Sequence, residues 1–535
     1  MTGPAGSAVS AVSAVSAEQA ALAGDLAEAA RRADAVLAGI ARDREGADAA
    51  TPDPGAGYRR ARAARVLAAV LAHRGMLARS AELHRWAERV DPGSSSAAGA
   101  IALVASGSPD AVADPSAVPD VPTLGAGTDA LVARGVVAAV RPGGSAAALS
   151  DLTRAAAVLE GGLPVLQDDS PAALGALVAM HRGESDLARG LLQRAVAADL
   201  GGAAFRRRHL LLLAWAEMAA GDMASARSHL AAAAERPEPV ETRDDLVLLG
   251  LEAGLARRSG DTGALLEVWG RSRETVLRHA VDLWSLLPLG ELVVTAARLG
   301  ERTWIAPQVR DAEALLAGLD HPALWTAPWH WRAFLAAVVA DDRAGAAARG
   351  ALLREAAAGE AEGSLAALLA DAAGRWLEVL DDEVDPEALG VTAAAMRDAG
   401  LAHDAARLAK EAAVRTPDRR TMTTLLGVAR SVLPSGSVPT AVPAAVAAGA
   451  PPDEDDGEAA VAAPAAAAPS RGNPLSGRES EVAALLLEGM THRQIGDRLF
   501  ISAKTVEHHV GRIRQRLGSG SRTELFADMR AALAS

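Results

Sequence analysis

A short basic stretch near the end of the chain holds the side chains best suited to binding another molecule. Residues 501–518 read ISAKTVEHHVGRIRQRLG, and Lys504 within it is one of only two lysines in the sequence. At about 100° per residue, its polar and charged side chains share one helix face and the edges of that face. Amine and guanidinium groups bind phosphates, whereas carboxylate and imidazole groups can bond to base edges. The stretch therefore predicts a nucleic-acid-binding surface that contains Lys504, Glu507, His508, Gly511, Arg512, Arg514 and Arg516.

Short helices must carry this surface, and the sequence marks where they start. The capping-box spacing S/T-x-x-E/Q occurs at Ser476, Thr491 and Ser521, and Ser502 is a favourable N-cap residue. Gly489 stands where the first of these helices should end. Four short helices are therefore predicted between residues 474 and 535.

The apolar residues of the first three helices predict how these helices pack. Each helix has a single apolar stripe that can face a common core while its other side stays polar. A short helix, a tight link over residues 500–502 and a helix with a basic outer face form a helix-turn-helix, whose second helix can enter the major groove of DNA. The stripes consist of Val482, Leu485 and Leu486, then Ile495 and Leu499, then Val506, Val510, Ile513 and Leu517.

This C-terminal segment resembles the LuxR/FixJ-type DNA-binding domain. The resemblance rests on the patterns L-S-x-R-E-x-E-V, I-x-x-R-L-x-I-S-x-x-T-V-x-x-H-V, I-x-x-R-L-G and S-R-T-E-L. It implies a four-helix domain that binds double-stranded DNA as a homodimer. By position in the pattern, the resemblance implies base contacts by Glu507, His508 and Gly511, and backbone contacts at or near Lys504, Thr505, Arg512 and Arg516.

Three positions depart from the family pattern. Gly496 replaces the usual alanine of the second helix, which should cost about 1 kcal/mol. Ser519 stands where the family has a small aliphatic residue, and Gly511 offers no side chain to a base. These departures concern affinity and sequence preference rather than the fold. A plainer interpretation of the arginines is a solvated helix face, but their clustering in one basic segment favours phosphate binding.

The rest of the chain predicts an all-α body. Half of the 535 residues are apolar, and only 3% are aromatic. Alanine and leucine are strong helix formers, and runs such as AARVLAAVLAHRGMLARSAELHRWAERV lack the alternation of a strand.

One phrase recurs in this body: a glycine, a small residue five positions later and an alanine seven positions after that. The glycine suits the end of a helix, and the small residues let the next helix pack closely. The copies resemble the second half of the tetratricopeptide repeat, which implies an α-solenoid of about twelve hairpins. An irregular helical bundle is the alternative. The four copies begin at Gly75, Gly183, Gly221 and Gly400.

Composition divides the chain into four parts. Residues 1–17 form a low-complexity N-terminus, and residues 18–431 form the tetratricopeptide-like helical repeat domain. Residues 432–473, rich in alanine and proline, predict a disordered linker, and residues 474–535 form the LuxR-type domain. The linker is interpreted as a flexible tether, although its DEDD cluster could instead compete with DNA for the basic segment.

Charge separates the C-terminal segment from the rest of the protein. Residues 471–535 hold ten Lys and Arg against seven Asp and Glu, a net charge of +3. Because the whole chain carries a net charge of −13, the other residues carry −16. An acidic body of this kind does not favour nonspecific binding to nucleic acid. A single basic domain is therefore expected to bind the DNA.

Several kinds of chemistry have no motif in the sequence. The chain has no cysteine, and neither lysine follows a glycine as a Walker phosphate loop requires. We find no H-E-x-x-H, no G-x-S-x-G and no complete dinucleotide fingerprint. No catalytic residue, metal site or cofactor is predicted. Without a basic leader or an uninterrupted apolar span, the sequence predicts a cytoplasmic protein that does not enter a membrane.

The run HPALWTAPWHWRAF concentrates three tryptophans around His330. Trp325, Trp329 and Trp331 could line a ligand pocket, but in a protein with few aromatic residues they favour a place in the core. Isolated histidines at helix positions are interpreted as structural: His84, His181 and His229.

Together these features predict a bacterial transcription regulator. Its helical repeats would sense an unidentified protein, peptide or small-molecule ligand, and its LuxR-type domain would bind DNA. The alternative is a helical-repeat scaffold that a DNA-binding tail localises. An enzyme with a cryptic helical active site is a third, less favoured, hypothesis.

Overall fold

The computed structural model describes residues 5–46, 55–92, 97–112, 124–161, 165–235 and 243–433 of the N-terminal part. In the C-terminal part it describes residues 477–487, 490–499, 506, 509, 510, 513, 517, 529 and 530. The chain divides into two compact units, Met1–Ala444 (the body) and Ala445–Ser535 (the C-terminal unit). Every regular element in the described ranges is a helix, which confirms the all-α class.

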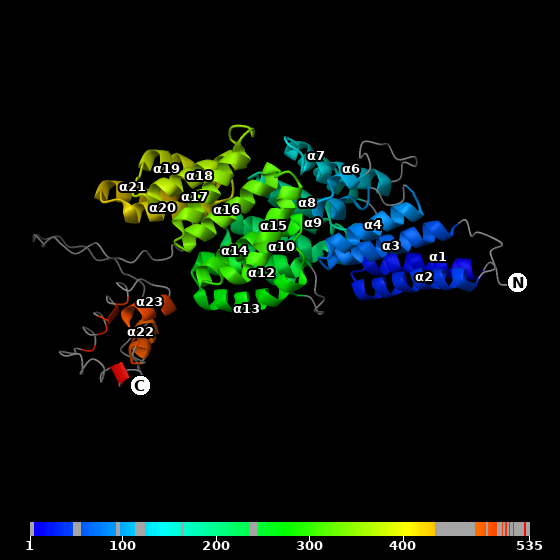
Figure 1. Cartoon of the computed structure of the whole chain (residues 1–535), viewed down its shortest axis with the longest axis horizontal. Helices are drawn as coiled ribbons and strands as arrows, with labels where there is room; N and C mark the ends of the chain where they lie inside the picture. The colour runs from blue at the N-terminus through cyan, green and yellow to red at the C-terminus, as the bar shows by residue number, and fades with distance from the viewer. Residues whose placement is uncertain are drawn as a thin grey trace, which may run out of the picture. The chain divides into compact units, whose positions relative to one another are not determined.

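The body is a succession of helices (Figure 1). The first are α1 (Ala5–Leu22), α2 (Leu26–Gly46), α3 (Ala56–His73), α4 (Leu77–Val90), α5 (Ala100–Ala105), η1 (Pro109–Ala111), α6 (Leu124–Ala138) and α7 (Ser145–Leu159). Next come α8 (Pro171–His181), α9 (Ser185–Ala197), α10 (Ala203–Ala220), α11 (Met223–Ala234), α12 (Arg243–Ser259), α13 (Thr262–Arg278), η2 (Leu283–Ser285) and α14 (Leu286–Leu299). The last are α15 (Arg302–Gly318), α16 (Ala323–Val339), α17 (Arg343–Ala357), α18 (Leu365–Leu380), α19 (Pro386–Asp398), α20 (Ala402–Arg415) and α21 (Arg419–Ser431).

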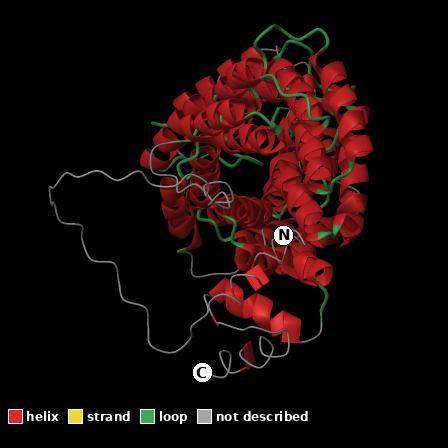
Figure 2. Ribbon diagram, turned by 90° about the vertical axis from the view of Figure 1, so that its left-hand side faces the viewer, coloured by secondary structure: helices red, strands yellow, loops and turns green. Residues whose placement is uncertain are grey.

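Successive helices pair into hairpins, and the first helices of neighbouring hairpins stack on one another. Helices α10, α12, α14 and α16 each contact the next helix of this series, and each also contacts its own hairpin partner. These inner helices are buried on nearly every side, which explains apolar sequences such as LLPLGELVVTAARL in α14. Figure 2 shows the helices of the body arranged around a central region. The body is thus a tetratricopeptide-like α-solenoid.

The recurring phrase forms the helix ends and the close helix packing that its residues predict. All four glycines lie one or two residues after the end of a first hairpin helix, with φ between +77° and +92°. This left-handed backbone favours glycine, so the glycine ends the helix and turns the chain. The small residues of the phrase are at most 3% exposed and let the paired helices pack closely: Ser80, Ala87, Ala188, Ala195, Ala226, Ala233, Ala405 and Ala412.

Two features of the body differ from the sequence-based expectations. Between Ala5 and Ser431 the described residues form 21 α-helices, fewer than twelve hairpins require, because short helices and long connections such as those around α5 occupy part of the chain. Helix α1 extends through most of the low-complexity N-terminus, so the boundary expected at residue 18 falls inside it. Alanines 14 and 17 of this segment are buried, and its alanine-rich sequence favours a helix. Helix α1 therefore includes these residues.

The solenoid also makes contacts between hairpins that are far apart in the sequence. Helix α8 contacts α16, and α10 contacts α20. The turn that joins α8 to α9 lies against the turn that joins α19 to α20: a methyl group on Gly183 would lie 3.1 Å from Cβ of Ala399, and one on Gly400 would collide with Oγ of Ser185. The second half of the body therefore returns to the first.

A buried ion cluster joins four of the inner helices. The Glu291 carboxylate of α14 is fully buried and lies 2.6 Å from Arg257, 3.3 Å from Arg258 and 3.6 Å from Arg332. Arg332 of α16 lies 3.4 Å from Asp404 of α20. Burial alone would raise the pKa of Glu291, but the charges of the three guanidinium groups outweigh it and hold that pKa well below its usual range.

A second buried ion network surrounds the segment that leads into α8. Asp169 is completely buried between Arg208 of α10, at 2.8 Å, and Arg243 of α12, at 2.9 Å. The neighbouring Asp168 lies 3.0 Å from Nε2 of His84 in α4. This polar segment is thus tied to three helices from different hairpins.

Several buried histidines predict how the stability of the body depends on pH. Burial lowers the pKa of His73, His181, His209 and His330 to about 4. From about pH 6.5 down to 4 the unfolded chain therefore binds more protons at these sites than the folded chain. Burial also lowers the pKa of His403. In the opposite direction, burial raises the pKa of Asp282 to about 6 and raises that of Asp129.

We accordingly expect the free energy of unfolding of the body to decrease as the pH is lowered from about 7 to about 5, because these five histidines with a lowered pKa outnumber the two carboxyl groups with a raised pKa. Urea denaturation followed by far-UV circular dichroism measures this dependence. His181→Gln should make this dependence shallower by removing one of the five histidines. A denaturation midpoint that stayed constant or rose on acidification would contradict the expectation.

Candidate nucleic-acid interface

The C-terminal unit is built on two described helices and a common apolar core. Helices α22 (Gly477–Leu487) and α23 (His492–Leu499) are followed by helical positions at residues 506, 509, 510, 513 and 517. All three predicted apolar stripes meet in one cluster, which confirms the predicted packing. The cluster contains Val482, Ala483, Leu485, Leu486, Leu487, Met490, Ile495, Leu499, Val506, Val510, Ile513, Leu517 and Met529.

The start of α23 shows the predicted capping box. The backbone N–H of Thr491 donates to Oε1 of Gln494 at 2.9 Å, and the backbone N–H of Gln494 donates to Oγ1 of Thr491 at 3.4 Å. The N–H of Met490 donates to the carbonyl of Leu485 at 3.2 Å and closes the end of α22. These bonds satisfy helix-terminal groups and set where α23 begins. Ser476, Ser502 and Ser521, expected to start the other helices, lie outside the described residues.

The core determines which side of the third helical segment can face DNA. Val506 and Ile513 are completely buried, and Val510 and Leu517 pack beside them. With the apolar stripe turned inward, the opposite side of a helix is left for another molecule. The predicted DNA-binding residues of that side lie outside the described residues: Lys504, Thr505, Glu507, His508, Gly511, Arg512, Arg514 and Arg516.

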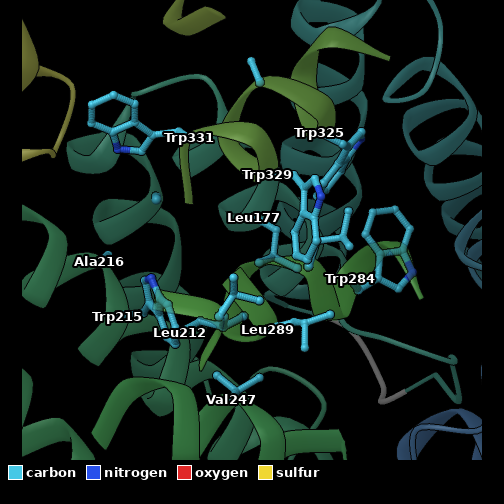
Figure 3. Packing of buried hydrophobic residues seen from close by; sticks show 14 of the residues in the cluster. Leu177, Leu212, Trp215, Ala216, Val247, Trp284, Leu289, Trp325, Trp329 and Trp331 are labelled. Atoms are coloured by element: carbon cyan, nitrogen blue, oxygen red, sulfur yellow. The ribbon is translucent and has the colours of Figure 1, made fainter. Parts of the chain in front are cut away.

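The tryptophan run of the body belongs partly to the core and partly to a pocket. Trp325 is fully buried, donates from Nε1 to the carbonyl of Ala139 at 2.9 Å and packs edge-on against Trp284. Trp329 and Trp331 are also buried, yet both line a pocket. In Figure 3 Trp331 lies apart from Trp325 and Trp329. Trp325 is therefore a core residue, whereas Trp329 and Trp331 also line a pocket.

The histidines that were interpreted as structural differ in burial. His84 and His181 are buried and contact other residues: His84 lies near Asp168, and Nδ1 of His181 lies 2.8 Å from the carbonyl of Leu177. His229 is half-buried. In the described part of the chain, His, Asp and Glu side chains form no group of three or more that could hold a metal ion.

Sequence reasoning missed the buried ion cluster around Glu291. A signal was present, since Glu291 is the one acidic residue in the apolar run LLPLGELVVTAARL. A charge in such a run must be paired once it is buried. Its partners come from α12 and α16, and no local pattern identifies them.

The capped helices, the shared core and the basic third segment define the class of this unit: it is a helix-turn-helix domain of a DNA-binding regulator. Comparison with protein families agrees. The family described as "Bacterial regulatory proteins, luxR family" matches residues 473–528. The spore germination protein GerE of Bacillus subtilis is 38% identical over 55 residues, which cover 10% of this chain and 74% of GerE. The chain belongs to the luxR family.

Two other relatives match the same part of the chain. The DNA-binding transcriptional activator DevR/DosR of Mycobacterium tuberculosis is 41% identical over 69 residues, 12% of this chain and 32% of the relative. The transcriptional regulatory protein DegU of Brevibacillus brevis is 44% identical over 54 residues, 10% of this chain and 23% of the relative. The chain thus spans about a third or less of the length of these two regulators.

One solved structure of another protein matches much of the chain. The crystal structure of the P58(IPK) TPR domain is 14% identical to the chain and covers 79% of it, with 98% of the domain matched, at a TM-score of 0.21. A likeness at this TM-score adds nothing to the fold described above. None of the described helices has the length and apolar character needed to cross a membrane.

Proposed function

We propose that this protein is a bacterial transcription regulator that binds double-stranded DNA through its C-terminal unit. The observation that carries the proposal is the single core formed by the three apolar stripes of a luxR-family helix-turn-helix. With this core formed, the proposal is that the basic side of the third helical segment enters a major groove. On DNA the protein acts as a homodimer, and in the cell it is cytoplasmic. No catalytic role is part of the proposal.

In this proposal each part of the chain has its own role. The repeat domain, residues 18–431 together with the α1 residues that precede them, senses a protein, peptide or small ligand. Residues 432–473 are a tether, and residues 474–535 bind DNA. Support comes from the separation into two compact units and from the luxR-family match, which lies entirely in the second unit.

The first test is DNA binding by a fragment of residues 471–535. Because the core and the Thr491 capping box lie within this segment, we expect the fragment to be helical and to bind a fluorescent DNA duplex at low salt. The full-length chain is measured in parallel. A well-folded fragment that fails to bind at low salt would reject the proposal. Transcript changes on deletion of the gene distinguish a regulator from a scaffold, which would leave promoter output unchanged.

The proposed roles of the DNA-binding residues are separable by salt and sequence. Lys504→Ala should weaken binding to operator and scrambled DNA alike and reduce the salt slope by about one unit, because one phosphate contact releases about one counterion. His508→Ala and Glu507→Ala should instead change base preference, at about 1–3 kcal/mol per position. Binding isotherms on both duplexes at several salt concentrations measure these effects. An unchanged salt slope for Lys504→Ala would remove its assigned role.

A further inference from the structure

We propose that the body binds a small organic anion with a flat apolar part, such as an aromatic carboxylate, in a pocket among α8, α10, α14, α16, α18 and the turn between α19 and α20. This inference rests on the proposed sensing function and names its site and ligand class. The pocket is narrow, with an enclosed volume of about 70 Å³, and it opens to solvent at its mouth. Its lining, which is mainly apolar with a few polar groups, is typical of a small-molecule site.

Tryptophan rings form much of the apolar wall. Trp215 comes from α10, and Trp329 and Trp331 come from α16. Figure 3 shows these three labelled rings on different sides of the same region of the body. Leu365 and Leu369 of α18 add aliphatic surface. An apolar wall rich in aromatic side chains favours a ligand with an apolar, planar part.

Arg332 supplies a positive charge to this apolar pocket. Its side chain lines the pocket and is 14% exposed, and its described ion pairs, with Glu291 and Asp404, both use Nη1. The cluster behind it holds three guanidinium groups, those of Arg257, Arg258 and Arg332, against two carboxylates. One positive charge is in excess, which an anionic ligand would neutralise. A planar guanidinium suits a carboxylate in particular.

Two neutral polar groups complete the lining. Burial lowers the pKa of His181 to about 4, so its ring is neutral near neutral pH. Because Nδ1 lies 2.8 Å from the carbonyl of Leu177, which only accepts, Nδ1 carries the proton and Nε2 is an acceptor. The hydroxyl of Ser185 also lines the pocket. A ligand with a hydroxyl or amide donor in addition to its carboxylate fits this set.

The pocket exists because the solenoid returns on itself. Met180, His181 and Ser185 of its wall come from the first half of the body, whereas Ala399 and Gly400 come from the turn that packs against the α8–α9 turn. A ligand that touches both sides binds the closed arrangement and adds to its stability. Binding is therefore expected to raise the thermal midpoint of the body.

The test uses the full-length chain and para-hydroxyphenylacetate as the probe. We expect a dissociation constant below about 1 mM by calorimetry and a rise in the thermal midpoint. The neutral analogue para-hydroxyphenylacetamide should bind about tenfold more weakly, because it lacks the charge that pairs with Arg332. Acetate, which lacks the ring, should not bind measurably. Failure of the acid to bind the folded chain, or equal binding of acid and amide, would overturn the proposal.

Two pairs of variants locate the site. Ala219→Phe fills the pocket and should abolish binding, whereas Ala220→Phe, on the next residue of α10 and outside the lining, should leave it unchanged. Arg332→Gln should remove the preference for acid over amide, and Arg332→Lys should retain it. If Arg332→Gln does not fold, comparison of Ala219→Phe with Ala220→Phe still tests whether the probe binds in this pocket. Binding that survives Ala219→Phe places the probe elsewhere and rejects this site.

Failure of this inference can be told apart from failure of the proposed function. DNA binding by the same preparation is measured beside probe binding. Intact DNA binding without probe binding rejects the pocket alone. Loss of DNA binding by a folded chain rejects the regulator proposal, whatever the probe does.

Discussion

Glu291→Gln is expected to lower the free energy of unfolding of the body by about 3–5 kcal/mol. The substitution keeps the shape of the side chain but removes its charge. Arg257 and Arg258, at 2.6 and 3.3 Å from the carboxylate and almost fully buried, would then lose their nearest counter-ion. Urea denaturation followed by circular dichroism measures the loss.

An exposed position provides the matched control for this substitution. Glu267→Gln on α13 makes the same chemical change at an exposed side chain and should alter stability by less than about 0.5 kcal/mol. Replacing Glu291, Arg257 and Arg258 together by apolar residues of similar volume should cost less than Glu291→Gln alone, because no unpaired charge remains between them. If Glu291→Gln were as harmless as Glu267→Gln, the cluster would not hold these helices together.

Ile513→Ala is expected to unfold most of the C-terminal unit and to abolish DNA binding. Ile513 is fully buried in the core shared by α22, α23 and the third helical segment. Removing its side chain beyond Cβ should cost about 2–5 kcal/mol. A single core in a domain of this size supplies about 3–5 kcal/mol in total, so little stability would remain.

The conservative variant and the other unit test the cause of that loss. Ile513→Val should cost about 0.5–1.5 kcal/mol and retain DNA binding. The denaturation transition of the body should be unchanged in both variants, because each unit has a hydrophobic core of its own. DNA binding by Ile513→Ala at the level of the unaltered protein would show that the core does not position the interface.

Local signals predicted the elements that depend on local chemistry. The Thr491–Gln494 pair is a capping box in the structure, and the four glycines of the recurring phrase end helices at positive φ. The spacing of apolar residues predicted the core of the C-terminal unit, because a helix stripe must be buried whatever it packs against.

Features that depend on the path of the whole chain could not be predicted in this way. The three arginine partners of Glu291 lie 33, 34 and 41 positions away, in other helices of the stack. The pocket needs the turn around Gly400 to reach Ser185, and only the curvature of the stacked hairpins determines that contact. The tryptophan run therefore could not be assigned to the core or to a pocket from its local sequence. The residues predicted to contact DNA remain predictions, since the structure does not describe them.

The contact between the turns of Gly183 and Gly400 also bears on how this protein can evolve. In an open solenoid each repeat touches only its neighbours, so whole repeats can be duplicated or lost with little effect elsewhere. Here the turn between α8 and α9 meets the turn between α19 and α20, and α8 meets α16. Adding or deleting a hairpin between these points would shift one turn away from the other. The number of hairpins in this segment is thereby held constant, and variation in length is left to the ends of the array.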